Sequence, residues 1–493
     1  MGESYHPNKP SRRFRSPSNP WIPYVGDCKA VNNYLESKQG IGWLFPKFLN
    51  SFFRGFSQVL FANNPLTGLI ILLALSWADP LVGLAAAVSA TFAIITALLL
   101  KQELRHIQSG LTTFNAVLIG SVTVSLWSPT FGVAVPLKLW VFIILGAIFS
   151  VFITSALTNL FSSYKLTLPC LTFPFNIVAL LLFTCLMPPI GPTGPGTGGE
   201  IEVSSMATPG LNTTSTELSR QVRETSGEVT DITQMSDDPE VSVELSVTEP
   251  TFISDVGTGS NETAEIDAYD EDEEEPDPNA VNWGHMLNGI LLSMGQVFGI
   301  NDLFASILIY IAVMVYSPVM CLVSIVGAIL GTIGGLLFTS APYTAVYTGL
   351  WGFNGILSAA AVGGYFIAMT CHSFWTAIAN VLFTVVIQQA LMVAFHSLRL
   401  PVFTLPFVLS TLLFLSVSAS GEQFPRVTNF SFPELHRYEY LERRRLNRIN
   451  RNMQDEALHP EEKELVLKDI KVIGDEPTEL GGNGTSSGGI TEK

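Results

Sequence analysis

The chain has 493 residues, of which 48% are hydrophobic and only 14% are charged, whereas about 25% of the residues in soluble domains are charged. This composition excludes an ordinary soluble globular protein and is typical of a protein that crosses a membrane several times. The formal net charge of −16 does not describe the whole chain, because 22 of the 42 acidic residues lie between Glu200 and Asp277. The acidity belongs to one loop, and no nucleic-acid partner is expected.

The first 190 residues divide into a polar tail and a block of apolar segments. Residues 1–40 are polar and rich in proline, which predicts a disordered tail. Residues 41–190 form the first transmembrane block, because roughly 20 apolar residues span a bilayer. An aromatic segment at 41–61 suits the membrane interface. About five spans follow, from the charge-poor segments 66–78, 81–100, 107–137, 139–160 and 167–189.

A hydrophilic linker separates this block from a second one. Residues 191–282 are rich in Ser, Thr, Glu and Asp and contain few aromatic residues, which predicts disorder. The linker contains acceptor sequences for N-glycosylation at Asn212 and Asn261. The second transmembrane block occupies residues 283–420, and a charged tail follows at 421–493.

The second block repeats the motifs of the first in the same order. Each block contains a Gln-Val pair, a Phe-Asn pair and a threonine between two prolines. The repeated positions are Gln58 and Gln296, 238 residues apart, Phe114 and Phe353, 239 apart, and Thr172 and Thr404, 232 apart. Three ordered motifs at nearly constant spacing indicate an internal duplication.

The number of spans in each block determines how the two blocks are related. Five spans are an odd number, so the second block must be inverted relative to the first, and both termini must lie on one side. Basic residues mark the cytoplasmic side, and the basic clusters at 12–15, 101–106 and 443–448 all fall on the side of the termini. We therefore expect about ten spans, cytoplasmic termini and an acidic linker outside the cell.

The Phe-Asn motifs interrupt apolar segments with glycine and amide groups. Irregular backbone at membrane depth occurs only where protein or a water-filled cavity surrounds it. In inverted-repeat transporters, such discontinuous segments meet near the bilayer centre and form the substrate site. The groups that the two blocks would bring together are Gln58, Phe114, Leu118 and Thr172 from the first, and Gln296, Phe353, Leu357 and Thr404 from the second.

None of these side chains is ionisable. A charge inside the membrane is the usual sign of ion or proton coupling, so its scarcity favours a passive pathway for a neutral polar solute. Hydrogen bonds worth about 0.5–1.5 kcal/mol each would offset dehydration without trapping that solute. Parallel phenyl faces would admit a planar molecule. The five cysteines show no metal-binding spacing, and we expect no metal, no cofactor and no enzymatic activity.

These motifs resemble those of the urea transporter family over residues 45–190 and 283–420. The resemblance implies an all-α membrane protein with two inverted five-helix repeats, each with a re-entrant pore helix. It also implies channel-like urea flux down its gradient, a homotrimer with one pore per protomer, and a location in the plasma membrane. The implied outer pore positions are Gln58, Phe61, Phe114, Leu118, Gln296, Val297, Phe353 and Leu357, with Thr172 and Thr404 in mid-pore.

The sequence departs from the duplicated pattern at two places. Gly299 stands where the first block has Phe61, and Asn301-Asp302 stand where it has Asn63-Asn64-Pro65. These differences concern one wall of the expected pore.

Other interpretations remain open at this point. The pore could carry another small neutral solute, such as water, ammonia or a urea analogue, or the chain could be a membrane scaffold or receptor. The glutamines could instead join helices, and the threonines could stabilise helix ends. His372 and His396 suit the membrane interface better than a paired ammonium site.

Overall fold

Helices form nearly all of the regular structure in the computed structural model, which describes residues 26–164, 168–187, 280–417, 424–427 and 429–451. The first half contains α1 (Lys29–Ser37), η1 (Ile41–Trp43), α2 (Leu44–Gln58), α3 (Pro65–Ala78), α4 (Pro80–Leu99), α5 (Leu104–Gln108), α6 (Phe114–Phe131), α7 (Leu137–Ser163) and α8 (Phe173–Leu186). The second half contains α10 (Trp283–Gln296), α11 (Leu303–Tyr316), α12 (Pro318–Leu336), α13 (Thr344–Tyr347), α14 (Gly352–Ala360), η2 (Ala361–Tyr365), α15 (Cys371–His396) and α16 (Leu405–Ser416). A last helix covers 433–451, and the β pairing in these ranges is one isolated bridge between Ile367 and Arg426. The all-α prediction is confirmed for these ranges.

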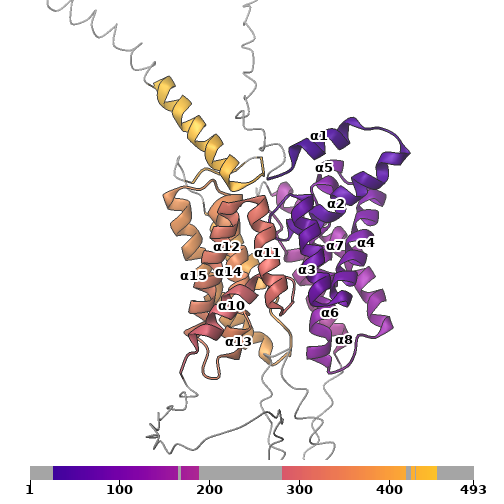
Figure 1. Cartoon of the computed structure of the whole chain (residues 1–493), viewed down its shortest axis with the longest axis vertical. Coiled ribbons are helices and arrows are strands. Elements are labelled where there is room, and N and C mark those ends of the chain that lie inside the picture. The colour runs from indigo at the N-terminus through magenta and orange to yellow at the C-terminus, as the bar shows by residue number, and fades with distance from the viewer. Residues whose placement is uncertain (1–25, 165–167, 188–279, 418–423, 428, 452–493) are drawn as a thin grey trace, which may run out of the picture.

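The second half repeats the helices of the first half in the same order. In each half three helices (α2–α4 or α10–α12) are followed by a very short one (α5 or α13). Then come α6 in the first half or α14 with η2 in the second, a long helix and a final short helix. The long helices α7 and α15 have 27 and 26 residues, and the pair α4 and α12 have 20 and 19. The two halves lie side by side in Figure 1.

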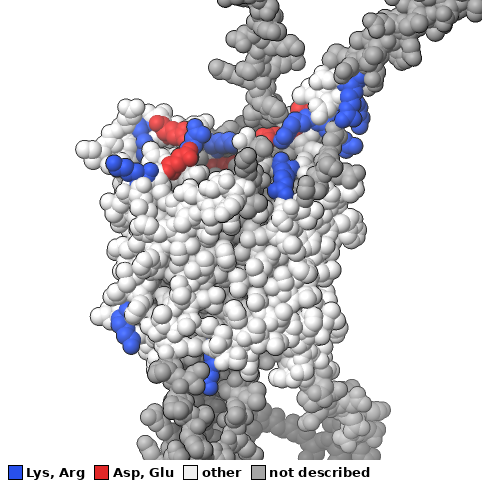
Figure 2. Space-filling model, turned by 180° about the vertical axis from the view of Figure 1, so that it is seen from behind, with Lys and Arg blue, Asp and Glu red and all other residues white. Residues whose placement is uncertain are grey.

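Several of these helices are suited to a lipid environment. Within the described ranges, five helices are long and apolar enough to cross a membrane: α4, α6, α7, α12 and α15. The shorter helices α3, α8, α11 and α16 are also apolar. Figure 2 shows a broad band free of Lys, Arg, Asp and Glu, with most of the charged residues gathered at one end. At that end lie α1, α5 and the helix 433–451 (Figure 1).

The two departures from the duplicated sequence pattern preserve the same backbone. Asn64 caps α3 by accepting from the amides of Leu66 and Thr67, and Asp302 caps α11 by accepting from Ala305. Either side chain can satisfy the free amides of a helix start. Phe61 and Gly299 likewise occupy equivalent turns in the two halves, with φ of 60° and 82°.

The halves meet through equivalent helices. α3 packs against α11, and α8 packs against α16. The hydroxyl of Thr67 in α3 donates to the carbonyl of Ala312 in α11 at 2.9 Å. This contact joins residues that are 245 positions apart in the chain, so the interface between the halves lies within the core.

Both segments predicted as polar tails contain ordered elements. Helix α1 lies within residues 1–40, and Asp27 and Cys28 before it are buried. The helix 433–451 lies within residues 421–493. Tertiary contacts to the bundle order these segments despite their polar composition. The linker positions Asn212 and Asn261 lie outside the described residues.

Gly68 is the position in α3 where the helices leave least space. A Cβ atom there would lie 1.7 Å from the carbonyl oxygen of Phe53 in α2. Gly68→Ala should therefore force α2 and α3 apart and lower the free energy of unfolding by about 3 kcal/mol. Thermal unfolding in detergent measures this loss. Gly42→Ala is the control, because a Cβ at Gly42 meets nothing within 4 Å; equal losses in both variants would contradict the close approach.

Candidate functional site

A cavity of about 450 Å³ lies where the first half meets the second. The first half contributes four of the predicted site residues to its wall: Gln58, Phe61, Phe114 and Thr172. The second half and the residues after it contribute four aromatic side chains: Tyr365, Phe366, Phe407 and Phe430. The rest of the wall comes from the first half and includes Thr112, Thr154 and Asn159. The wall therefore combines aromatic rings with amide, hydroxyl and aliphatic groups.

The cavity reaches one of the two duplicated threonines, and that threonine contacts the other. Thr172 is part of the wall, and its hydroxyl lies 2.7 Å from that of Thr404. Asn176 of α8 donates to the Thr404 hydroxyl at 2.9 Å and to the Thr172 carbonyl at 2.8 Å. Each threonine precedes its helix, α8 or α16, and follows a residue with a left-handed backbone, Leu171 or Phe403. The two repeated turns thus bring hydroxyls from both halves together.

The amide of Gln58 is held by the other half of the protein. Gln58 is the last residue of α2, and its Nε2 donates to the hydroxyl of Tyr365 at 3.1 Å. The next turn contains Phe61, whose φ of 60° is strained for a bulky side chain. Its ring lies 4.9 Å from that of Tyr365 and also contacts Phe407. Strained backbone of this kind is concentrated at functional sites.

The remaining predicted positions are buried outside this cavity. Gln296 donates from Nε2 to the carbonyl of Thr348 at 2.9 Å, so its amide bonds within its own half, unlike that of Gln58. Thr404 lies directly behind Thr172. The other members of the set are also buried and do not line the cavity: Leu118, Val297, Phe353 and Leu357. The structure therefore brings Gln58, Phe61, Phe114 and Thr172 to one cavity, while the other predicted positions do not line it.

Tyr365, Phe366, Phe407 and Phe430 are wall residues that the sequence analysis did not select. Phe407 belongs to the duplicated proline motif, which provided a signal. Tyr365 has no repeated counterpart, because the offset of the Phe-Asn motif assigns it to Leu126. Phe430 lies in a segment whose composition predicts a polar tail.

Charged groups occur only at the rim of the cavity wall. Glu103 and His106 contribute to the wall from the α5 turn, and their side chains are 53–59% exposed and 3.9 Å apart. Deeper in, the polar groups are neutral amides and hydroxyls. Within the described ranges, no group of three or more His, Cys, Asp and Glu side chains could hold a metal ion. The site can exchange hydrogen bonds with a neutral solute.

Comparison with known proteins assigns the chain to a family. The family model described as urea transporter matches residues 49–234 and 252–419. The chain is 28% identical to urea transporter 1 of Ovis aries over 426 residues, covering 85% of this chain and 89% of the relative. It is 28% identical to urea transporter 1 of Rattus norvegicus over 431 residues, covering 85% and 90%. The chain belongs to the urea transporter family, and it is a transporter rather than an enzyme.

Proposed function

We propose that this protein carries urea passively across the plasma membrane through a narrow, uncharged, channel-like path. Family membership and the names of its relatives support urea as the substrate. The observation that carries the proposal is the cavity in which amide and hydroxyl groups of the first half face the hydroxyl of Tyr365 and aromatic rings of the second. Urea is a planar molecule with amide donors and a carbonyl acceptor, so glutamine and threonine side chains complement it.

The path in this proposal runs through both groups of predicted residues. Urea would enter the cavity past Gln58, Phe61 and Phe114, and would cross at Thr172 and Thr404. It would leave past Leu118 and the second-half group, Gln296, Val297, Phe353 and Leu357. The absence of charge in these groups supports uncoupled movement down the urea gradient.

The architecture proposed with this function is two inverted five-helix repeats. Each repeat would contain a re-entrant pore helix, which gives about ten spans with both termini in the cytoplasm. The matching helix order of the two halves supports a duplication. The charged end in Figure 2 supports a common side for the basic clusters at 101–106 and 443–448. A homotrimer in the lipid bilayer, with glycans at Asn212 and Asn261, completes the proposal.

Removing both glutamine side chains tests the assignment of the polar groups. Gln58→Ala combined with Gln296→Ala should lower urea flux in proteoliposomes about tenfold, because two hydrogen bonds of about 0.5–1.5 kcal/mol are lost. Stopped-flow light scattering after a urea gradient measures the flux. Gln389→Ala on α15 is the matched control, since Gln389 neither lines the cavity nor belongs to the proposed path. Unchanged urea flux in the double variant would reject the assignment of the glutamines to the path. Flux of another neutral solute without any urea flux would reject urea as the substrate.

A further inference from the structure

We propose that Tyr365 is a further solute-contacting residue that determines which amide-like molecules pass. We propose also that a C-terminal segment, residues 424–427 and 429–436, positions it. This inference rests on the proposed function and deepens it. Tyr365 ends η2, a π-helical turn that follows α14, and its side chain is buried in the cavity wall. Interruptions of this kind in a helix are frequent at functional sites.

The bond between Gln58 and Tyr365 fixes the polarity of both groups. Because Nε2 of Gln58 donates to the Tyr365 hydroxyl, the amide oxygen of Gln58 is left as an acceptor. The hydroxyl accepts this bond and keeps its own proton for donation. The pair therefore offers one acceptor and one donor to a molecule in the cavity. This pattern complements a solute with an N–H group beside a carbonyl oxygen.

Two rings enclose the ring of Tyr365. Phe61 from the first half lies 4.9 Å away at an interplanar angle of 37°. Phe430 from the C-terminal segment lies 5.5 Å away at 12°, in a stacked arrangement. Phe430 also lines the cavity and is 51% exposed. The family match ends at residue 419, so this part of the wall comes from outside the matched region.

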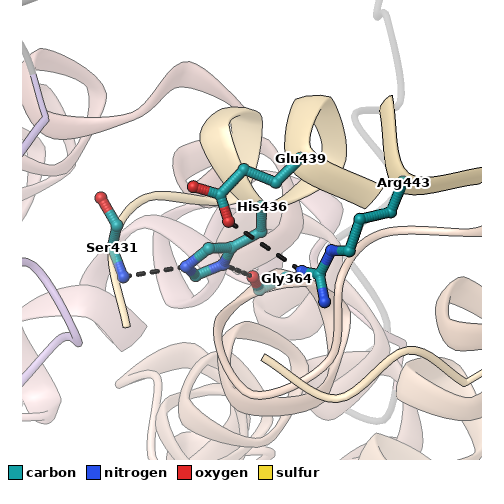
Figure 3. A network of polar contacts seen from close by, with 5 residues as sticks. All are labelled: Gly364, Ser431, His436, Glu439 and Arg443. Atoms are coloured by element: carbon teal, nitrogen blue, oxygen red, sulfur yellow. Dashed lines mark hydrogen bonds and ion pairs between the residues drawn. The ribbon is translucent and has the colours of Figure 1, made fainter. Parts of the chain in front are cut away.

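The C-terminal segment also holds the backbone on both sides of Tyr365. His436 is buried, and its Nε2 accepts from the amide of Ser431 at 2.8 Å. Its Nδ1 therefore carries the proton and donates to the carbonyl of Gly364 at 2.9 Å (Figure 3). On the other side, the amide of Val427 donates to the carbonyl of Phe366 at 3.0 Å. These bonds fix the residues before and after Tyr365.

A residue near the N-terminus, Asp27, also bonds to the C-terminal segment. The hydroxyl of Ser431 donates to the carboxyl group of Asp27. Burial raises the pKa of Asp27, and the bond from Ser431 opposes that rise. Because Ser431 follows Phe430, the bond ties the ring that stacks on Tyr365 to Asp27, which lies just before α1. The position of Tyr365 thus depends on both terminal segments.

Tyr365→Phe tests the contact, because it removes the hydroxyl and keeps the ring. Urea and thiourea fluxes are measured in proteoliposomes of the full chain. Sulfur accepts hydrogen bonds weakly, so the loss of a donor should affect urea more. We expect urea flux to fall about five- to tenfold, with a change in thiourea flux of about twofold or less. A lower urea-to-thiourea ratio is a readout that a purely structural role would not move.

Tyr310→Phe is the matched control, since the Tyr310 hydroxyl is buried, donates to the carbonyl of Ile290 at 3.2 Å and does not line the cavity. It should leave the ratio unchanged. Phe430→Ala removes the stacked ring and should lower the ratio about two- to threefold, within the range measured for aromatic pairs. An unchanged ratio in Tyr365→Phe overturns the contact, and an unchanged ratio in Phe430→Ala overturns the positioning. Absence of urea flux in the wild type would instead reject the proposed function.

Discussion

Replacing Thr172 and Thr404 together by valine should lower urea flux about 100-fold, which is the largest functional loss that we expect. Valine keeps the branched shape but removes the hydroxyl, so the substitution isolates the polar contribution. The two hydroxyls lie 2.7 Å apart at the end of the cavity. A solute that crosses there without partners loses about 1–3 kcal/mol for each unmet hydrogen bond.

The control for this prediction is Thr184→Val in the same helix, α8. Thr184 is exposed, and its hydroxyl donates to the carbonyl of Leu180 at 2.7 Å, so the variant makes the same chemical change away from the cavity. Flux should remain within about twofold of the wild type, as is usual for surface substitutions. Stopped-flow light scattering compares the variants at equal protein content. If the valine pair conducted urea like the control, the threonines would serve only to stabilise the helix ends.

Arg54→Met should cause the largest loss of stability, about 3–5 kcal/mol in the free energy of unfolding. Arg54 lies in α2 and is completely buried. Its Nε donates to Oδ1 of Asn50 at 3.2 Å, Nη2 donates to the carbonyl of Asp27 at 2.8 Å, and Nη1 donates to Asn63. Methionine fills similar space but leaves these acceptors without donors.

Thermal unfolding in detergent measures the effect of Arg54→Met. Arg54→Lys should retain little of the stability that Arg54 provides, because an ammonium group cannot reproduce the planar guanidinium that bonds to three residues. Lys47→Met is the control, because Lys47 lies on the same helix and makes one bond, to the carbonyl of Lys38 at 2.9 Å. A melting temperature of Arg54→Met equal to that of the control would show that the buried guanidinium does not hold α2 to its neighbours.

The duplicated motifs made much of this protein predictable from its sequence. The all-helical class, the family and urea transport are confirmed. The order of the motifs anticipated the matching helices of the two halves, and the structure brings Thr172 and Thr404 into contact. Such predictions succeed because apolar segment length and repeated turns are local properties of the chain.

The rest could not be predicted because it depends on tertiary contacts. Asn64 and Asp302 are different residue types, but each caps the helix that follows it. The two halves therefore differ in sequence here and not in backbone structure. Tyr365 belongs to one half only, and a search for duplicated residues passes over it. Phe430 follows residues of polar composition, and tertiary contacts such as the bonds of His436 and the stacking on Tyr365 place its ring at the cavity.

Urea flux through purified protein, with the Na⁺ and H⁺ gradients collapsed, tests the central claim most directly. Proteoliposomes are compared with protein-free liposomes of the same lipid, and initial rates are recorded across a urea gradient alone and again with each ion gradient imposed. We expect a rate well above that of the protein-free liposomes, and the same rate under all three conditions. A rate equal to that of protein-free liposomes, or one that requires an ion gradient, would contradict passive conduction along the uncharged path.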